Sequence, residues 1–333
     1  MLAARFHGDG EIEFMDVPTP EPGEGELLVR VAACGVCGSD HKVLRGGSRF
    51  TPGHEVAGTV AETGPGCTTP DGARIAVYLP RHCGECSYCR QGRGNLCPHS
   101  KGLLGWNTDG GYAEYMLVPD RNALLLDDAV SFDEGVVLLD TLGTSGHAVR
   151  LAEASGAESA LVIGAGPIGA GALACMKAFG VETVFVAELS AYRREKAAEL
   201  GGVPVDPQAE DLEERVREEF PYGVDVVVEA AGTLPTIWQS LDLVRPGGTV
   251  CVVGEYWGAV ELERPKGRWM LNDITVIRSF YFTLPEFAEN QRMVLDGRLP
   301  AAEMVTHRFP LTEMAAAFDI FLSGKALKVM VTP

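Results

Sequence analysis

The chain has 333 residues, of which 46% are hydrophobic and 22% are charged, as expected for a soluble globular protein of about two domains. Its formal net charge of −18 argues against binding nucleic acid or anionic membranes, because such surfaces need clustered Lys and Arg. The N-terminus lacks a signal-peptide pattern and no apolar run reaches the ~18–20 residues of a membrane span, so we expect a cytoplasmic location.

Short runs rich in Val, Ile and Tyr, bounded by Gly or Pro, fill roughly the first 130 residues. Four of these runs are residues 26–34, 55–64, 73–80 and 112–119. Short segments of this composition between turn residues are typical of β-strands. They predict an irregular β-barrel in the N-terminal part of the chain.

The first of these runs leads into a C-x-x-C pair formed by Cys34 and Cys37. This spacing occurs in redox dithiols and in halves of zinc sites, and also where the cysteines have no function. Ser39, Asp40 and His41 follow directly, so the same loop carries further reactive groups. The spacing alone leaves all three interpretations open.

A second cysteine cluster has the spacing C-x2-C-x2-C-x7-C, at Cys83, Cys86, Cys89 and Cys97. Four thiolates directed at one point suit tetrahedral Zn²⁺ and leave no position open for substrate, which is the pattern of a structural zinc site. Close cysteine triplets also bind iron–sulfur clusters. The nucleotide-binding pattern found later in the chain needs no second redox centre, and disulfides are disfavoured without a secretion signal.

From Leu138 onward, apolar strand-like runs alternate with helical segments. Residues 159–163, 181–190, 224–232 and 247–256 are runs of this kind. Strands buried on both faces lack the polar alternation of a half-exposed strand. The alternation with helices therefore predicts a doubly wound parallel sheet covered on both sides.

The sequence GAGPIG, from Gly164 to Gly169, matches G-x-G-x-x-G between a strand and an apolar helix. Gly164 would permit the tight turn, Gly166 would let the backbone approach a pyrophosphate, and Gly169 would allow close helix–strand packing. The start of the helix would offer free N–H groups to the phosphates. This context predicts a dinucleotide site rather than a structural glycine turn in another α/β fold.

Glu188 ends the next strand, about 20 residues after the glycines. A carboxylate there can accept hydrogen bonds from the adenosine ribose and repels a 2′-phosphate, so NAD is favoured over NADP. Arg193 and Arg194 lie nearby in the sequence and could accommodate a 2′-phosphate, so NADP remains an alternative. The tail after Thr283 is mostly helical and ends in a strand-like run at residues 327–333, which we expect to return to the first domain.

Five motifs occur in order over nearly the whole chain, and together they closely resemble the zinc-containing medium-chain dehydrogenase/reductase family of alcohol, polyol and sugar dehydrogenases. The motifs are CGVCGSD, GHEVAG, the four-cysteine run, DGGYAEY and GAGPIG. The resemblance implies a GroES-like irregular β-barrel catalytic domain and a Rossmann doubly wound parallel-sheet domain. The first would span residues 1–145 and 285–333 with a structural zinc lobe at about 80–100, and the second, binding NAD, residues 146–284.

The resemblance also implies a catalytic zinc with one open coordination position. Cys37, His54 and Asp140 match its three protein ligands. Glu55 matches a glutamate that can approach the metal as an alternate ligand. Asp40 matches the carboxylate that orients the zinc histidine.

In the mechanism that the resemblance implies, zinc lowers the pKa of the substrate hydroxyl and the alkoxide carbon gives hydride to the nicotinamide. Ser39 matches the residue that receives the hydroxyl's proton, and Thr144 matches a small residue beside the nicotinamide. Many members complete the proton relay with a histidine where this chain has Lys42, and His41 stands one position earlier. His41 is therefore either a relay residue or an exposed loop residue, and the departure favours sugars or polyols.

The implied site residues form three groups. The catalytic group is Ser39, Asp40, His41 and Glu55, with Cys34 left as a buried residue without a ligand role. The cofactor group is Gly164, Gly166, Pro167, Ile168, Gly169, Glu188, Arg193, Thr144 and Val253. The metal group is Cys37, His54 and Asp140 for the catalytic zinc and Cys83, Cys86, Cys89 and Cys97 for the structural zinc.

We therefore expect an NAD-dependent oxidoreductase with two Zn²⁺ per chain that oxidises a secondary alcohol of a polyol, sugar or cyclitol, or a simple alcohol. We also expect a homodimer or homotetramer, with residues 273–282 as either an interface strand or an internal one. One alternative is a non-catalytic relative, which would be expected to lose Cys37, His54 or Ser39. The other is a zinc-free NADPH reductase of the same superfamily, which the intact ligand set opposes.

Overall fold

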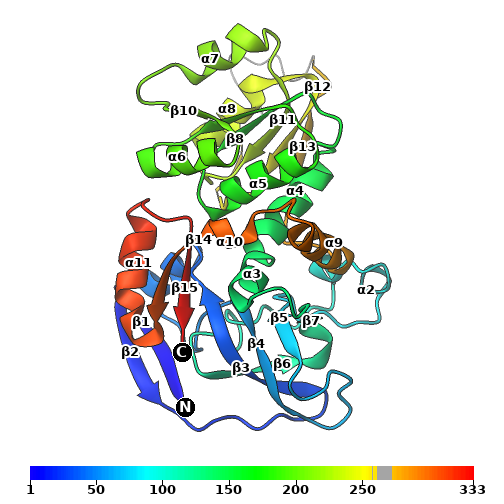
Figure 1. Cartoon of the computed structure of the whole chain (residues 1–333), viewed down its shortest axis with the longest axis vertical. Helices are drawn as coiled ribbons and strands as arrows, with labels where there is room; N and C mark the ends of the chain where they lie inside the picture. The colour runs from blue at the N-terminus through cyan, green and yellow to red at the C-terminus, as the bar shows by residue number, and fades with distance from the viewer. Residues whose placement is uncertain (257, 261–271) are drawn as a thin grey trace. The chain divides into compact units, whose positions relative to one another are not determined.

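The computed structural model describes residues 1–256, 258–260 and 272–333 (Figure 1). They form two compact units, Met1–Asp140 with Phe282–Pro333, and Thr141–Tyr281. The first unit is discontinuous in sequence, and the second is inserted into it. The boundaries expected from sequence, 145/146 and 284/285, lie slightly further along the chain.

The first unit is built on a seven-stranded sheet with the order β14-β15-β3-β4-β5-β7, in which β6 also pairs with β3. The long strand β3 (Glu26–Gly35) points Leu27, Val29 and Val31 into the core at every second position, as a pleated strand must. The other elements of this unit are β1 (Leu2–Gly8), β2 (Glu11–Asp16), α1 (Asp40–Gly46), β4 (Glu55–Thr63), β5 (Arg74–Val77), α2 (Ser87–Arg90), η1 (Gly94–Leu96), β6 (Tyr115–Pro119), η2 (Asp120–Asn122), β7 (Ala123–Leu125), α3 (Phe132–Val137), α9 (Leu284–Leu295), α10 (Ala301–Met304), β14 (Val305–Pro310), η5 (Leu311–Glu313), α11 (Met314–Leu322) and β15 (Lys328–Thr332).

The C-terminal strand β15 completes this sheet. It runs antiparallel to β3, with Met330 opposite Gly35 and Val331 opposite Cys34, and it pairs with β14 on its other side. The predicted return of the last strand to the first domain is confirmed. The end of the chain therefore lies beside the residues that lead into the C-x-x-C loop.

The second unit contains a six-stranded sheet in which every recorded pairing is parallel. The order β10-β9-β8-β11-β12-β13 places the first strand of the unit beside the fourth, which is the topology of a doubly wound dinucleotide fold. The prediction of a doubly wound parallel sheet is confirmed. The elements are η3 (Asp140–Thr144, beginning at the unit boundary), α4 (Ser145–Leu151), β8 (Ser159–Ile163), α5 (Pro167–Ala178), β9 (Thr183–Ala187), α6 (Ala191–Glu199), β10 (Val203–Val205), α7 (Leu212–Glu219), β11 (Val224–Glu229), α8 (Leu234–Leu243), β12 (Val244–Val252) and β13 (Thr275–Arg278).

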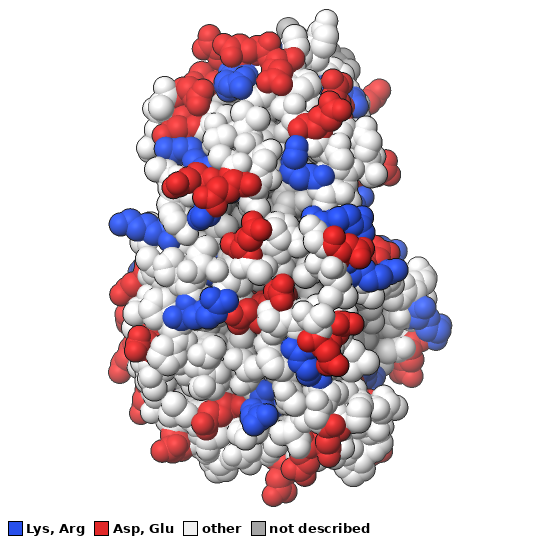
Figure 2. Space-filling view, viewed as in Figure 1, with Lys and Arg blue, Asp and Glu red and all other residues white. Residues whose placement is uncertain are grey.

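The surface and the helices agree with the composition. Among the described residues, no helix combines the length and apolar character needed to cross a membrane. On the face drawn in Figure 2, acidic side chains alternate with Lys and Arg. Such a mixed charged face is what water solvates well.

Candidate functional site

The loop after β3 carries Cys37 into the first candidate site. The Cys37 backbone N–H donates to Asp40 Oδ2 at 3.0 Å, and the Asp40 N–H donates to the Cys37 carbonyl at 3.1 Å. Ser39 immediately precedes α1, and its Oγ donates to Cys37 Sγ over 3.2 Å. His41 lies half-buried in the first turn of α1, and Lys42 beside it is exposed. The loop thus fixes Cys37 through both Asp40 and Ser39.

His54 enters the same site from the segment before β4. The preceding Gly53 has a φ of +101°, and a Cβ there would lie 2.7 Å from Tyr112 N, so only glycine fits. His54 is 3% exposed, and its Nδ1 lies 3.1 Å from Asp40 Oδ1, at ion-pair distance but outside the angles of a hydrogen bond. The other ring nitrogen, Nε2, faces Asp140 Oδ2 at 3.4 Å.

Asp140 is the first residue of a π-helix, Asp140–Thr144. Single π-turns are rare and occur frequently at functional sites. Asp140 Oδ2 lies 3.8 Å from Cys37 Sγ, and Oδ1 is buried without a hydrogen-bond partner in the described part of the chain. A buried carboxylate oxygen without a partner is costly, and a bound cation would remove that cost.

The donor set fits a zinc ion. Cys37, His54, Glu55 and Asp140 each bring a ligand atom into one group whose atoms all lie within 4.8 Å of one another. Tetrahedral zinc with N and O ligands at about 2.0–2.2 Å and sulfur at about 2.3 Å separates its ligand atoms by roughly 3.3–3.7 Å. The observed separations of 3.4 Å and 3.8 Å are close to that spacing.

The charges in this site favour a cation. Burial by itself lowers the pKa of His54, but the carboxylates of Asp40 and Asp140 raise that pKa well above its ordinary value. Burial raises the pKa of Asp140, yet hydrogen bonding to His54 and its charge bring that pKa below its ordinary value. The carboxylates of Asp40 and Asp140 are therefore stabilised by a positive charge between them. Either a proton on His54 or a divalent cation can supply that charge.

Lys328 is a member of this site that sequence reasoning missed. It is 1% exposed, and its Nζ donates to Glu55 Oε1 at 2.7 Å, to Glu55 Oε2 at 2.6 Å and to the Val36 carbonyl at 3.3 Å. Both oxygens of the expected alternate ligand are therefore engaged by lysine. The available signal was a single Lys within an otherwise apolar C-terminal run, because a lysine in a buried strand needs a partner.

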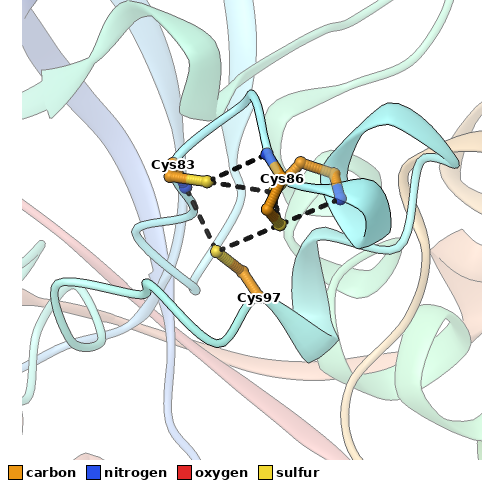
Figure 3. A group of neighbouring side chains, drawn as sticks. Cys83, Cys86 and Cys97 are labelled. Carbon is orange, nitrogen blue, oxygen red and sulfur yellow. Dashed lines mark hydrogen bonds between the residues drawn. The ribbon is translucent and has the colours of Figure 1, made fainter.

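The four-cysteine cluster forms a separate group within the first unit. Figure 3 shows Cys83, Cys86 and Cys97 with their sulfur atoms facing one another. The Sγ atom of Cys89 lies 3.8 Å from that of Cys83 and 3.4 Å from that of Cys86, and the Cys86 and Cys97 sulfurs are 3.9 Å apart. Four sulfurs at about 2.3 Å from a tetrahedral zinc are roughly 3.8 Å apart, so this group also fits the metal.

Backbone N–H groups prepare these thiols for a cation. The N–H groups of Cys83, Cys86 and Cys89 each donate to a cluster sulfur at 3.4 Å. Backbone donors, those of Glu85 and Cys86, lower the pKa of Cys83 to about 6. The thiolate is the form that binds metal, so Cys83 is prepared for zinc at neutral pH. Burial and the neighbouring thiols raise the pKa of Cys89 to about 12, so that thiol would release its proton on metal binding.

The lobe is also tied to the returning C-terminal part of the chain. The Leu284 N–H donates to the Gly92 carbonyl at 2.8 Å, and a Cβ on Gly92 would lie 2.7 Å from Pro285. Nearby, buried Tyr78 donates its hydroxyl to the Phe282 carbonyl at 2.6 Å. The lobe therefore packs where the chain re-enters the first unit.

The glycine motif connects β8 to α5 in the second unit. Gly164 has a φ of +90°, and a Cβ on Gly169 would lie 1.7 Å from the Gly164 carbonyl oxygen, so both positions require glycine. Pro167 is the first residue of α5, where its missing N–H costs nothing. The Ile168 carbonyl accepts a hydrogen bond from Ser145 Oγ at 2.7 Å, which ties the loop to α4.

Glu188 follows β9 and contacts the glycine loop directly. Its Oε2 accepts the Ala165 N–H at 2.6 Å, and its Oε1 accepts the Ser190 N–H at 2.8 Å. Arg193 also lies near this loop, because a Cβ on Gly166 would be 3.8 Å from its Nη1. The predicted acidic residue and Arg193 therefore both lie at this loop.

Two further residues predicted to contact the cofactor lie elsewhere in the second unit. Thr144 ends the π-helix, and its Oγ1 is buried without a hydrogen-bond partner among the described residues. Val253 follows β12 and donates its N–H to the Glu229 carbonyl at 2.8 Å. Glu229, which sequence reasoning did not single out, is fully buried and accepts the Gly232 N–H at 2.8 Å through Oε1.

Comparison with known proteins matches both parts of the chain. Residues 23–128 match the family model described as alcohol dehydrogenase GroES-like domain, and residues 167–296 match the model described as zinc-binding dehydrogenase. The chain is 32% identical to L-galactonate-5-dehydrogenase of Escherichia coli K12 over 323 residues, covering 94% of this chain and 93% of that protein. It is 32% identical to a sorbitol dehydrogenase of Halalkalibacterium halodurans over 342 residues, covering 100% and 98%.

The solved structures agree with this likeness. The alcohol dehydrogenase from Thermus sp. ATN1 superposes with a TM-score of 0.94 at 29% sequence identity, covering 100% of both chains. The first unit is therefore a GroES-like irregular barrel and the second a Rossmann-type domain, as the motifs predicted.

Proposed function

Because the chain belongs to the zinc-containing medium-chain dehydrogenase/reductase family, we propose that it is an NAD-dependent dehydrogenase acting on a secondary alcohol of a polyol, sugar or cyclitol, or on a simple alcohol. The observation that carries this proposal is the convergence of ligand atoms from Cys37, His54 and Asp140 in one buried group. The relatives named for L-galactonate and sorbitol support a polyhydroxylated substrate.

In this proposal Cys37, His54 and Asp140 hold the catalytic zinc. When bound, the zinc would act as a Lewis acid that lowers the pKa of the substrate hydroxyl. Asp40 lies 3.1 Å from His54 Nδ1 and keeps Nε2 of the same ring directed at the metal position. Glu55 is bound through both oxygens to Lys328, so it approaches the metal only when that ion pair opens.

Ser39 receives the proton of the substrate hydroxyl in this scheme. Its Oγ lies 3.2 Å from Cys37 Sγ, so it stands next to the position that the reacting oxygen would occupy. His41, half-buried in the first turn of α1, passes the proton on to solvent.

We propose that NAD binds along the glycine loop, with its pyrophosphate at the N-terminus of α5. Glu188 and Arg193, which both lie at this loop, would meet the adenosine ribose. The remaining contacts proposed are Gly164, Gly166, Pro167, Ile168, Gly169, Thr144 and Val253.

The cofactor preference should change when Glu188 loses its charge. We expect Glu188→Gln to lower the ratio of kcat/KM for NAD to kcat/KM for NADP by about tenfold or more, roughly 1.4 kcal/mol, because the carboxylate no longer repels a 2′-phosphate. Arg193→Ala should move the ratio in the opposite direction. Initial rates with both cofactors measure it, and a ratio unchanged in both variants would remove Glu188 from the proposed role.

The four-cysteine lobe is proposed to hold a structural zinc. We expect Cys97→Ser to retain about one of two zinc ions per chain. If the free energy of unfolding falls by about 3 kcal/mol, its unfolding temperature Tm should fall by roughly 6–12 °C. Cys67→Ser is the matched control, because Cys67 is half-buried, its thiol donates to the Glu26 carbonyl at 3.2 Å, and it lies outside the four-cysteine group. Metal analysis and thermal unfolding report both effects, and equal zinc contents in the two variants would count against the lobe site.

The proposed activity is tested by NAD⁺ reduction over a panel of alcohols, polyols, aldoses and cyclitols, before and after removal of zinc by a chelator. We expect a rate with at least one polyhydroxylated substrate, its loss on chelation and its return with added zinc. Activity that survives complete removal of zinc from the Cys37 site contradicts the mechanism.

We also propose that the protein forms a homo-oligomer through the edge strand β13. This strand pairs with β12 and ends the described sheet, and Val276 and Phe280 are 39% and 47% exposed. An unpaired apolar edge of this kind favours pairing with a second copy. The opposite edge of the sheet is the short strand β10, which contains Pro204, and a proline on an edge strand disfavours pairing with another chain.

Charging this edge should weaken the assembly. We expect Val276→Lys to shift the mass measured by light scattering toward the monomer, because the lysine cannot be buried at the interface. Leu322→Lys, at a 48% exposed position of α11, is the matched control and should leave the mass unchanged. A monomeric wild-type protein would exclude this interface.

A further inference from the structure

We infer that Tyr112 is a positioning residue for the catalytic metal site, acting through Asp40 on two of the three ligands at once. The inference rests on the proposed function, because it takes Cys37, His54 and Asp140 as the ligands. Tyr112 lies in the motif DGGYAEY, and nothing in the proposed mechanism uses its hydroxyl.

The hydroxyl of Tyr112 reaches the carboxylate that orients the site. Tyr112 is fully buried and Asp40 is 1% exposed. The Tyr112 hydroxyl donates to Asp40 Oδ2 at 2.6 Å, and the Gly35 carbonyl lies 3.3 Å from the same hydroxyl. Because a phenol has one proton to donate, the short contact to the carboxylate takes it.

Asp40 transmits this contact to both ligands. Its Oδ2 also accepts the Cys37 N–H at 3.0 Å, and its Oδ1 lies 3.1 Å from His54 Nδ1. Rotation of the carboxylate would therefore disturb the backbone of Cys37 and the ring of His54 together. The Tyr112 hydroxyl is the side-chain donor that restrains that rotation from within the core.

The backbone of Tyr112 supports the same site from the opposite direction. Its N–H donates to the Pro52 carbonyl at 3.0 Å, in the turn before His54. A Cβ on Gly53 would lie 2.9 Å from Tyr112 Cγ, so the ring packs against the residue next to the ligand. The ring is itself fixed by Phe6, with ring centroids 5.9 Å apart.

These contacts give Tyr112 little freedom and make its hydroxyl a fixed reference point for Asp40. Groups behind the ligands that orient them typically change metal affinity 10–100-fold when removed. Tyr112→Phe removes the hydroxyl and leaves the ring packing in place. We therefore expect weaker metal binding at the Cys37 site with little change in the fold.

The test compares Tyr112→Phe with Tyr78→Phe. Tyr78 is also fully buried and also donates its hydroxyl over 2.6 Å, but to the Phe282 carbonyl beside the cysteine lobe. Each variant is loaded with Co²⁺, and a chelator competes for the ion while the visible bands of the one-thiolate site are followed. We expect the affinity of that site to fall about 10–100-fold in Tyr112→Phe, with altered bands, and to stay at the wild-type value in Tyr78→Phe.

A double-mutant cycle with Asp40→Asn checks the route of the effect. If Tyr112 acts through Asp40, then Tyr112→Phe should weaken Co²⁺ binding far less in the Asp40→Asn background than in the wild type. Additive effects, an unchanged affinity in Tyr112→Phe, or equal losses in Tyr112→Phe and Tyr78→Phe would each overturn the inference. If Cys37→Ala retains the one-thiolate bands, the proposed metal site itself is wrong and the inference falls with it.

Discussion

Replacing Lys328 with methionine is expected to lower the free energy of unfolding by about 1–2 kcal/mol at about pH 8, because one proton changes stability by about 1.4 kcal/mol per pH unit. Lys328 and Glu55 are 1% and 0% exposed, and the lysine engages both carboxylate oxygens. Methionine fills a similar volume but leaves a buried carboxylate without a counter-ion. A buried carboxyl that loses its counter-ion avoids an unpaired charge by staying protonated, which limits the loss to about 1.4 kcal/mol per pH unit above the wild-type pKa.

The size of this loss should depend on pH. Burial raises the pKa of Glu55 to about 7 even though Lys328 opposes the rise. Below that pH the carboxyl is protonated in both proteins, so the pair contributes little and the two should differ least. As the pH rises through about 7, the wild-type carboxylate ionises and is paired. In Lys328→Met the lysine charge no longer lowers the pKa of Glu55, so the folded pKa lies higher still. The folded variant then binds more protons than its unfolded state, so the variant loses stability relative to the wild type.

Urea unfolding at about pH 6 and pH 8 measures this difference. Lys196→Met is the control for removal of a lysine charge, because Lys196 pairs with Glu199 at 2.7 Å on the surface. That exposed pair should contribute less than about 1 kcal/mol. Glu55→Gln combined with Lys328→Met should recover much of the loss, since no buried charge remains. Equal losses in Lys328→Met and Lys196→Met would contradict the expected role of burial.

Cys37→Ala is expected to lose the proposed catalytic zinc and to reduce kcat/KM by about 1,000-fold or more. Withdrawal of a ligand leaves His54 and Asp140 as the proposed protein ligands, and a loss of about 4 kcal/mol of transition-state stabilisation corresponds to that factor. Zinc content should fall by about one ion per chain, with the cysteine lobe retaining its own. Metal analysis and initial rates at saturating NAD measure the two effects.

Cys34→Ala separates ligand loss from simple loss of a buried thiol. Cys34 is fully buried three residues earlier, and burial raises its pKa well above the ordinary value, which disfavours the thiolate. Its sulfur lies outside the group formed by Cys37, His54, Glu55 and Asp140. We expect Cys34→Ala to keep both metals and most of the activity, at a modest cost in stability. A variant that lost zinc as Cys37→Ala does would show that the C-x-x-C pair works as a unit.

The fold was predictable where local chemistry carries a recognisable pattern. The alternation of strands and helices predicted the parallel sheet. The glycine motif could be recognised in the sequence because Gly169 lies so close to the Gly164 carbonyl that no other residue fits there. The cysteine lobe was predictable for the same reason, since its ligands lie within one short segment. Patterns of this kind depend on spacing along the chain, which sequence preserves.

The supporting residues of the candidate metal site could not be predicted in the same way. Lys328 meets Glu55, and Tyr112 meets Asp40, only after the sheet has paired strands that are far apart in sequence. Neither residue belongs to a motif whose spacing indicates its partner. The π-helix at Asp140 was equally hidden, because no local residue pattern predicts the widened turn.

The discontinuity of the first unit has a consequence for synthesis on the ribosome. Residues 141–281 form a continuous unit whose sheet is complete before the C-terminal segment is translated. The barrel, by contrast, lacks β14 and β15 until residues 305–332 have been synthesised. Until then Cys34 and Gly35 of β3 lack their partner strand and the carboxylate of Glu55 lacks Lys328. A nascent chain stalled before residue 305 would therefore carry a folded Rossmann-type unit and an incomplete GroES-like barrel, which is the state that chaperones and proteases would encounter.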